Sequence, residues 1–136
     1  MIQIIAGKKG SGKTKRIIDM TNEMANKSDK NVVFIDDDRS YTLDINRNAR
    51  FVNACEYNIK TPEMFLGFLC GMLSSNYDIG YIFIDAFLKL IKTDLADAEW
   101  FFTSMNELCK KHNIEFVLSI SADPADLPNY LKGYII

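Results

Sequence analysis

Short apolar runs alternate with longer amphipathic runs along the chain. The apolar runs are rich in Ile, Val and Phe, which is typical of strands buried inside a sheet. The amphipathic runs repeat their apolar residues every three or four positions, which predicts helices with one buried face. Strands that alternate with helices usually run parallel, so the pattern predicts βαβ units. The predicted strands are residues 2–6, 32–36, 50–55, 81–85, 115–121 and 134–136.

Three long helices and one short helix are predicted between these strands. Thr61 is a favourable N-cap and Pro62 suits the first helical position, so this pair marks the start of the second helix. That helix is apolar on most sides, which predicts burial between other elements. The predicted helices are residues 13–26, 62–74 and 94–112, and a short one opens at Asp123 and Pro124.

The elements together predict one nucleotide-binding domain over residues 1–136, since a chain of 136 residues has the length of a single domain. We expect a three-layer α/β/α sandwich with a mostly parallel sheet. Numbered along the chain, the strands are predicted to lie in the order 6-1-5-4-2-3, with two right-handed crossovers on each face. In such sheets ligands bind at the C-terminal ends of the strands.

The segment GKKGSGKT, residues 7–14, fits the P-loop pattern G-x-x-x-x-G-K-[ST] at every fixed position. It follows a predicted buried strand and opens a predicted helix, which is the setting in which helix N-termini bind phosphate. We expect Lys13 to reach the β- and γ-phosphates and the Thr14 hydroxyl to bind Mg²⁺. The predicted nucleotide-binding residues are Gly7, Lys8, Lys9, Gly10, Ser11, Gly12, Lys13 and Thr14.

A second candidate metal ligand ends the strand YIFID, where Asp85 follows four apolar residues. Together with the P-loop, this position predicts a Walker-B acid that holds Mg²⁺ with Thr14. The next residue is Ala86. Many ATPases of the additional-strand class have a catalytic Glu there, so the usual base that activates water is missing.

Charge and composition limit the kinds of partner that the chain is expected to bind. A formal net charge of −2 does not indicate a nucleic-acid partner. Three widely spaced cysteines, Cys55, Cys70 and Cys109, form no C-x-x-C pair, which argues against a disulfide framework and a zinc site. No apolar stretch approaches the roughly 20 residues that span a membrane. We therefore expect a cytoplasmic protein without a membrane partner.

The order of strands and motifs resembles the RecA-like P-loop ATPases, a group that includes the strand-exchange recombinases. In that family the catalytic acid follows the second strand, and VVFIDDD places Asp38 at this position. YIFIDAFLKL resembles the Walker-B strand of the family and the apolar stretch after it. FVLSISAD resembles its sensor strand, with Ser121 where the family often has Gln or His. The resemblance implies a RecA-like fold with ATP and Mg²⁺ as cofactors. The chain departs from the family after the fifth predicted strand, where we expect no room for the DNA-binding loops of recombinases.

Arginine is confined to the first fifty residues, at Arg16, Arg39, Arg47 and Arg50. Phosphoryl transfer often uses an arginine finger on the γ-phosphate. We expect such a finger from the 39–50 segment of a neighbouring copy, in a homo-oligomer, or from a protein partner. Three Asp at residues 36–38 repel one another, and Mg²⁺, Arg39 or Lys13 would offset their charge.

The leading hypothesis is Mg-ATP binding with slow hydrolysis to ADP, in which Asp38 orients the attacking water, Lys13 holds the phosphates and Ser121 senses the γ-phosphate. Absence of the guanine-binding N-K-x-D motif favours ATP over GTP. One alternative is a non-catalytic nucleotide switch or regulatory subunit, favoured by Ala86. Another is a small-molecule kinase whose acceptor would bind near residues 38–50. The sequence leaves open whether the chain is an enzyme.

Overall fold

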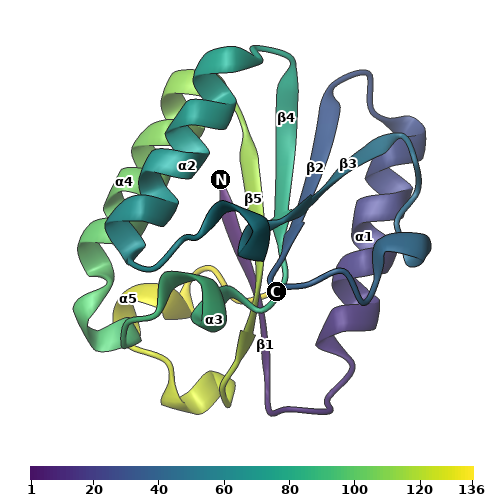
Figure 1. Cartoon of the computed structure of the whole chain (residues 1–136). Coiled ribbons are helices and arrows are strands. Elements are labelled where there is room, and N and C mark those ends of the chain that lie inside the picture. Colours follow the sequence, from purple (N-terminus) through teal and green to yellow (C-terminus); the bar gives the residue numbers. More distant parts are fainter.

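Five parallel strands form one sheet at the centre of the protein (Figure 1). The computed structural model describes residues 1–136. The strands lie in the order β1-β5-β4-β2-β3. Their bounds are β1 Ile2–Gly7, β2 Asn31–Asp36, β3 Ala49–Asn53, β4 Ile79–Ile84 and β5 Glu115–Ser121.

Helices cover both faces of this sheet, which gives a three-layer α/β/α sandwich (Figure 1). One face carries α1 alone, and the other carries α2 and α4 side by side, with α3 and α5 near the carboxyl ends of the strands. The predicted fold class is therefore confirmed. The helices are α1 Lys13–Lys27, α2 Pro62–Ser75, α3 Phe87–Ile91, α4 Glu99–His112 and α5 Asn129–Lys132.

Two hydrophobic cores lie on the two faces, because side chains alternate along each strand. Ile35, Ile84 and Leu118 share the larger core with α2, α3 and α4. Phe34, Phe83 and Val117, one residue earlier, share the smaller core with α1. The central strands are thus buried on both faces, which explains why they appear in the sequence as continuous apolar runs.

Two crossovers lie on each face, as predicted. β1 connects to β2 through α1, and β2 connects to β3 on the same face through a loop whose Ile45 is buried in the smaller core. That loop contains only a short 3₁₀ helix, η1 (Thr42–Asp44), instead of an α-helix. The chain then returns on the opposite face, through α2 to β4 and through α3 and α4 to β5.

The C-terminal residues 134–136 take the predicted place beside β1, but as an isolated bridge and not as a full strand. Ile4 donates its backbone N–H to the Tyr134 carbonyl at 2.8 Å, and Ile136 donates to the Ile4 carbonyl at 2.9 Å. The pairing is limited to these residues because α5 and the turn after it occupy the chain immediately before.

The third long helix begins later than predicted, at Glu99 and not at residue 94. The Leu95 carbonyl accepts hydrogen bonds from the Ala98 N–H and the Tyr130 hydroxyl, so it does not accept the helical bond from Glu99. Residues 95–97 therefore form a 3₁₀ turn. The sequence did not predict α3, because its apolar residues follow β4 without an amphipathic period. No helix has the length and apolar character that crossing a membrane requires.

Candidate functional site

Strand register brings three polar residues into one row at the carboxyl end of the sheet. Ile35 is level with Ile84, and Ile84 is level with Leu118. The next residues, Asp36, Asp85 and Ser119, are therefore neighbours on the face that α1 covers. All three are buried. This row lies beside the first turn of α1, where the P-loop ends.

The P-loop connects β1 to α1 through a tight turn in which two glycines have positive φ. Gly10 has φ of 84° and Gly12 has φ of 87°, a backbone region that residues with a Cβ rarely adopt. Gly12 is also the N-cap of α1. The glycines of the motif are thus required by the conformation of the loop itself.

The N-terminus of α1 carries no side-chain cap and no acidic residue in its first turn. Most helices satisfy these N–H groups with a Ser, Thr, Asp or Asn side chain. Free N–H groups and the positive end of the helix dipole together favour an anion. The backbone of this terminus alone therefore favours a bound anion such as phosphate.

Lys13 is the most buried Lys of the P-loop, with 8% of its surface exposed. Its ammonium group donates to the Lys8 carbonyl at 3.0 Å and to the Ser11 hydroxyl at 3.4 Å. The side chain therefore folds back over the loop instead of extending into solvent. In this position the charge is available to phosphate oxygens bound within the loop.

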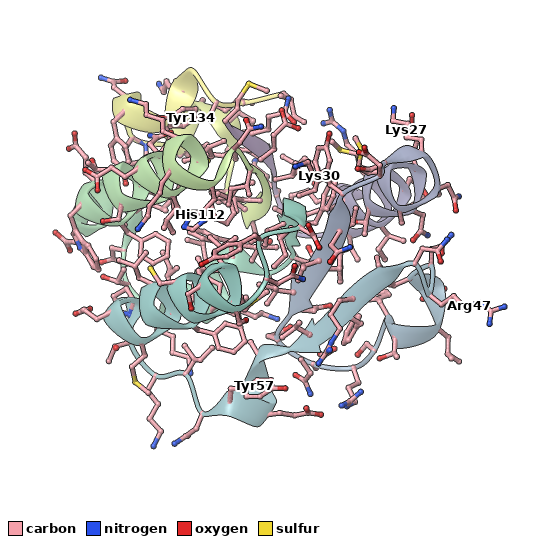
Figure 2. The ribbon with its side chains drawn as sticks, turned by 90° about the horizontal axis from the view of Figure 1, so that it is seen from above. Lys27, Lys30, Arg47, Tyr57, His112 and Tyr134 are labelled. Carbon is pink, nitrogen blue, oxygen red and sulfur yellow. The ribbon has the colours of Figure 1, made fainter.

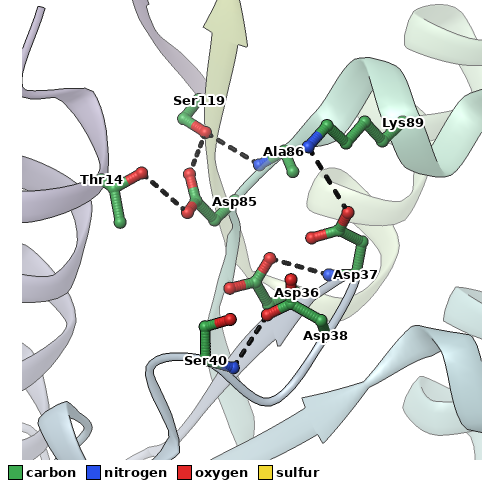
Figure 3. Close-up of polar contacts among 9 residues, drawn as sticks. All are labelled: Thr14, Asp36, Asp37, Asp38, Ser40, Asp85, Ala86, Lys89 and Ser119. Carbon is green, nitrogen blue, oxygen red and sulfur yellow. Dashed lines mark hydrogen bonds and ion pairs between the residues drawn. The ribbon is translucent and has the colours of Figure 1, made fainter. Parts of the chain in front are cut away.

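Thr14, Asp85 and Ser119 form one hydrogen-bonded chain (Figure 3). The Thr14 hydroxyl donates to Asp85 Oδ2 at 3.1 Å, and the Ser119 hydroxyl donates to Asp85 Oδ1. Ser119 Oγ in turn accepts the Ala86 N–H at 3.0 Å. The predicted pair of metal ligands is thus in direct contact, and hydroxyl and carboxylate oxygens are ligands that Mg²⁺ prefers.

Asp36 is the buried member of the acidic triplet, with 2% of its surface exposed. Burial raises the pKa of this carboxyl from 3.8 to about 8, the side chain of Asp37 and the charge of Asp85 add to the rise, and the Asp37 backbone N–H opposes it. Its Oδ1 accepts the Asp37 N–H at 2.7 Å, and its Oδ2 has no partner. Of the counter-charges predicted for the triplet, neither Arg39 nor Lys13 forms an ion pair with it, whereas Mg²⁺ stays a prediction.

Asp37 and Asp38 lie in the loop after β2, and both line the same cavity as the P-loop. Asp37 Oδ2 lies 3.7 Å from the ammonium group of Lys89 on α3. Asp38 is exposed, and its Oδ1 accepts the Ser40 N–H at 2.8 Å. The backbone and side-chain hydrogen bonds from Ser40 lower the pKa of Asp38. The candidate water-orienting residue is thus ionised at neutral pH and held at the cavity wall.

A cavity of about 660 Å³ joins these groups at the carboxyl ends of β1, β2, β4 and β5. Both lysine and aspartate side chains line it. Such a volume lies within the usual range of small-molecule sites. The lining includes Lys9, Lys13, Thr14, Lys15, Asp36, Asp37, Asp38, Ser40, Tyr41, Asp85, Ala86, Phe87, Lys89, Ser119 and Ser121.

No arginine lines this cavity. Arg39 is paired with Glu56, and Arg16 donates to the carbonyl of Ile136 at 3.3 Å. Arg47 is exposed and extends outward from the body of the protein (Figure 2). Arg50 lines a separate cavity of about 360 Å³. This second cavity lies at the amino ends of β2 and β4, where Asn31 and Ile79 also line it. Residues 38–50 were expected to supply an arginine finger or to hold a kinase acceptor. Of these residues, only Asp38, Ser40 and Tyr41 line the cavity.

Sequence reasoning missed Ser119 and selected Ser121 instead. Ser121 is exposed at the end of β5, level with Gly7, and lines the cavity without a side-chain hydrogen bond. Ser119 is buried and contacts Asp85 directly. A serine in the middle of an apolar strand was the available signal, but only the register shows that it adjoins Asp85.

We expect Ser119→Ala to lower the free energy of unfolding by about 1–3 kcal/mol, because it leaves the Ala86 N–H and Asp85 Oδ1 without their shared partner. Urea denaturation measures this difference. Ser121→Ala is the matched control, and we expect less than about 0.5 kcal/mol there because Ser121 is exposed. Equal effects of the two substitutions would contradict a bridging role for Ser119.

Comparison with known proteins finds similarity among solved structures only. No model of a known protein family matches the chain, and no curated protein matches it. Among solved structures it is similar to the crystal structure of domain III from the Thermotoga maritima replication initiation protein DnaA, with a TM-score of 0.44 and 15% sequence identity. The likeness covers 98% of this chain and 50% of that chain, so this chain spans half the length of its neighbour.

Proposed function

We propose that the chain binds Mg-ATP in the P-loop cavity and hydrolyses it slowly. The observation that carries this proposal is the contact between Thr14 and Asp85 at the uncapped N-terminus of α1. Phosphates would lie against the loop N–H groups of residues 7–14 and the ammonium group of Lys13. Thr14 and Asp85 would hold Mg²⁺, which neutralises the phosphate charge when bound.

Hydrolysis would depend on residues at the cavity wall. Asp38 is the candidate for orienting the attacking water, because it is ionised and lines the cavity. Ser121 is the candidate for contacting the γ-phosphate, because it lies level with Gly7 at the end of β5. These assignments follow the RecA-like order of strands and motifs, in which the acid follows the second strand. A cationic finger would come from another copy or from a partner.

A nucleotide switch without catalysis is the second candidate, and two observations favour it. Ala86 occupies the place of a catalytic Glu and takes a left-handed conformation with φ of 54°. No arginine lines the cavity. Such a protein would bind ATP and ADP and would signal through a partner that distinguishes them.

Asp38→Asn is expected to slow ATP hydrolysis at least about tenfold while leaving ATP affinity nearly unchanged. An acid that orients water acts in the transition state and contributes little to ground-state binding. The wild-type rate should be on the order of 10⁻³ s⁻¹ or lower without a partner. Release of labelled phosphate from concentrated protein measures the rate of hydrolysis. Equilibrium dialysis of the same samples measures the affinity for ATP.

The matched control for this experiment is Asp44→Asn, which removes an exposed carboxylate of η1 outside the cavity. It should hydrolyse ATP at the wild-type rate. Binding without turnover in the wild type would favour the switch. Equal rates in wild type and Asp38→Asn would show that Asp38 is not the water-orienting residue. The same measurements with GTP test whether the site prefers ATP.

A further inference from the structure

Asp36 at the end of β2, and Asp37 and Asp38 in the loop after it, direct their carboxylates to one place. One oxygen from each of Asp36, Asp37 and Asp38 can be chosen so that all three lie within 4.8 Å of one another. Figure 3 shows the carboxylates of Asp36 and Asp38 beside each other below Asp85. Carboxylates at this separation repel one another unless a cation or a proton lies among them.

The buried oxygen of Asp36 is the strongest single observation. Its Oδ1 accepts the Asp37 N–H, whereas Oδ2 is enclosed by protein and has no hydrogen-bond partner. The Asp36 residue also lines the cavity, which is a space that a ligand can enter. A buried polar atom without a partner is rare in folded proteins and calls for an explanation such as a bound ion.

The cations of the chain do not fill this role. Lys13 is engaged by the Lys8 carbonyl and the Ser11 hydroxyl, and Lys89 reaches only Asp37, at 3.7 Å. Asp36 and Asp38 form no ion pair. Asp85 adds a fourth carboxylate on the neighbouring strand. Lys89 is therefore the only cation paired with the triplet, and it does not reach the buried Asp36.

We propose that Asp36, Asp37 and Asp38 bind a hard divalent cation, at a site separate from the Thr14–Asp85 pair. Three oxygens spread evenly around one Ca²⁺ lie about 4.0–4.5 Å apart, and around Mg²⁺ they lie closer. Oxygens that lie within 4.8 Å of one another therefore reach this spacing after small rotations of the exposed Asp38 and half-buried Asp37. The site needs no nucleotide, and cation binding would place positive charge opposite the P-loop.

Titration of EDTA-stripped, nucleotide-free protein with Mn²⁺, followed by electron paramagnetic resonance, tests this site. We expect one bound Mn²⁺ per wild-type chain, and at least about tenfold weaker binding in Asp36→Asn, which loses the buried ligand charge. Asp38→Asn should also weaken binding. Because the Asp38 carboxylate is exposed, this substitution should not disturb folding, so it tests the site even if Asp36→Asn fails to fold. Competition with Ca²⁺ and Mg²⁺ identifies the preferred cation.

Thr14→Ala is the matched control, because it alters only the P-loop ligand pair and should keep the nucleotide-free Mn²⁺ site. No Mn²⁺ binding at millimolar concentration in the wild type would overturn the proposal. So would unchanged binding in both Asp36→Asn and Asp38→Asn, or loss of binding in Thr14→Ala. The result is independent of the proposed function, because a chain that bound Mn²⁺ here and failed to bind ATP would refute only the latter.

Discussion

Asp36→Asn is expected to abolish a pH dependence that makes the metal-free wild type less stable as the pH rises from 5 to 8. The wild-type carboxyl has a pKa of about 8 in the folded chain, raised mainly by burial, against an ordinary value of 3.8. Asn carries no titrating group. We expect the stability difference between the two proteins to change by roughly 3 kcal/mol over this range.

The direction of this effect follows from proton binding. Between the two pKa values the folded chain keeps a proton on Asp36 that the unfolded chain has released. Unfolding in this range therefore releases a proton, and a rise in pH favours it. The stabilising contribution is complete below about pH 4 and is lost as the pH passes through about 8.

Urea denaturation in EDTA at several pH values between 5 and 9 measures this effect, because EDTA removes any bound cation. Asp38→Asn is the matched control. Its carboxyl has a lowered pKa, so it is ionised throughout the range and the substitution should shift stability equally at every pH. Parallel stability curves for wild type and Asp36→Asn would show that Asp36 is ionised at neutral pH in the folded state.

Lys13→Ala is expected to weaken Mg-ATP binding by about 3 kcal/mol, or roughly a hundredfold. The buried ammonium group contacts the Lys8 carbonyl within the loop, and phosphate oxygens bound there would receive its hydrogen bonds. Loss of a charge-assisted hydrogen bond in a partly buried site costs more than loss of an exposed charge. Competition against a fluorescent ATP analogue measures the affinity.

Lys15→Ala provides the control, since Lys15 lines the same cavity but pairs with Asp19 and has 82% of its side chain exposed. We expect an effect of threefold or less, because an exposed charge is screened by solvent. Similar losses in both variants would indicate attraction by the general charge of the cavity instead of a specific contact from Lys13.

Most of the fold was predictable from local patterns. Alternating apolar and amphipathic runs gave the five strands, and the order of motifs gave their positions in the sheet. The P-loop was predictable from its motif, because Gly10 and Gly12 supply the positive φ angles that its turn requires. Thr14 and Asp85 also met as predicted, since both lie at the carboxyl end of the sheet.

What the sequence did not supply was the register between strands distant along the chain. Ser119 adjoins Asp85 only because Ile84 is level with Leu118. Asp36 and Asp38 look equivalent in the triplet, yet Asp36 is still within β2 and buried, whereas Asp38 lies in the exposed loop. Burial raises the pKa of Asp36, whereas hydrogen bonds in the exposed loop lower the pKa of Asp38.

Calorimetric titration of Mg-ATP into the wild-type chain, beside a titration of ATP in EDTA, tests the central claim most directly. The account predicts binding of one Mg-ATP per chain and weaker binding in EDTA, because Thr14 and Asp85 lie where the cation of Mg-ATP would bind. Absence of binding at millimolar Mg-ATP, by heat or by displacement of a fluorescent analogue, would contradict the claim that this P-loop holds a nucleotide.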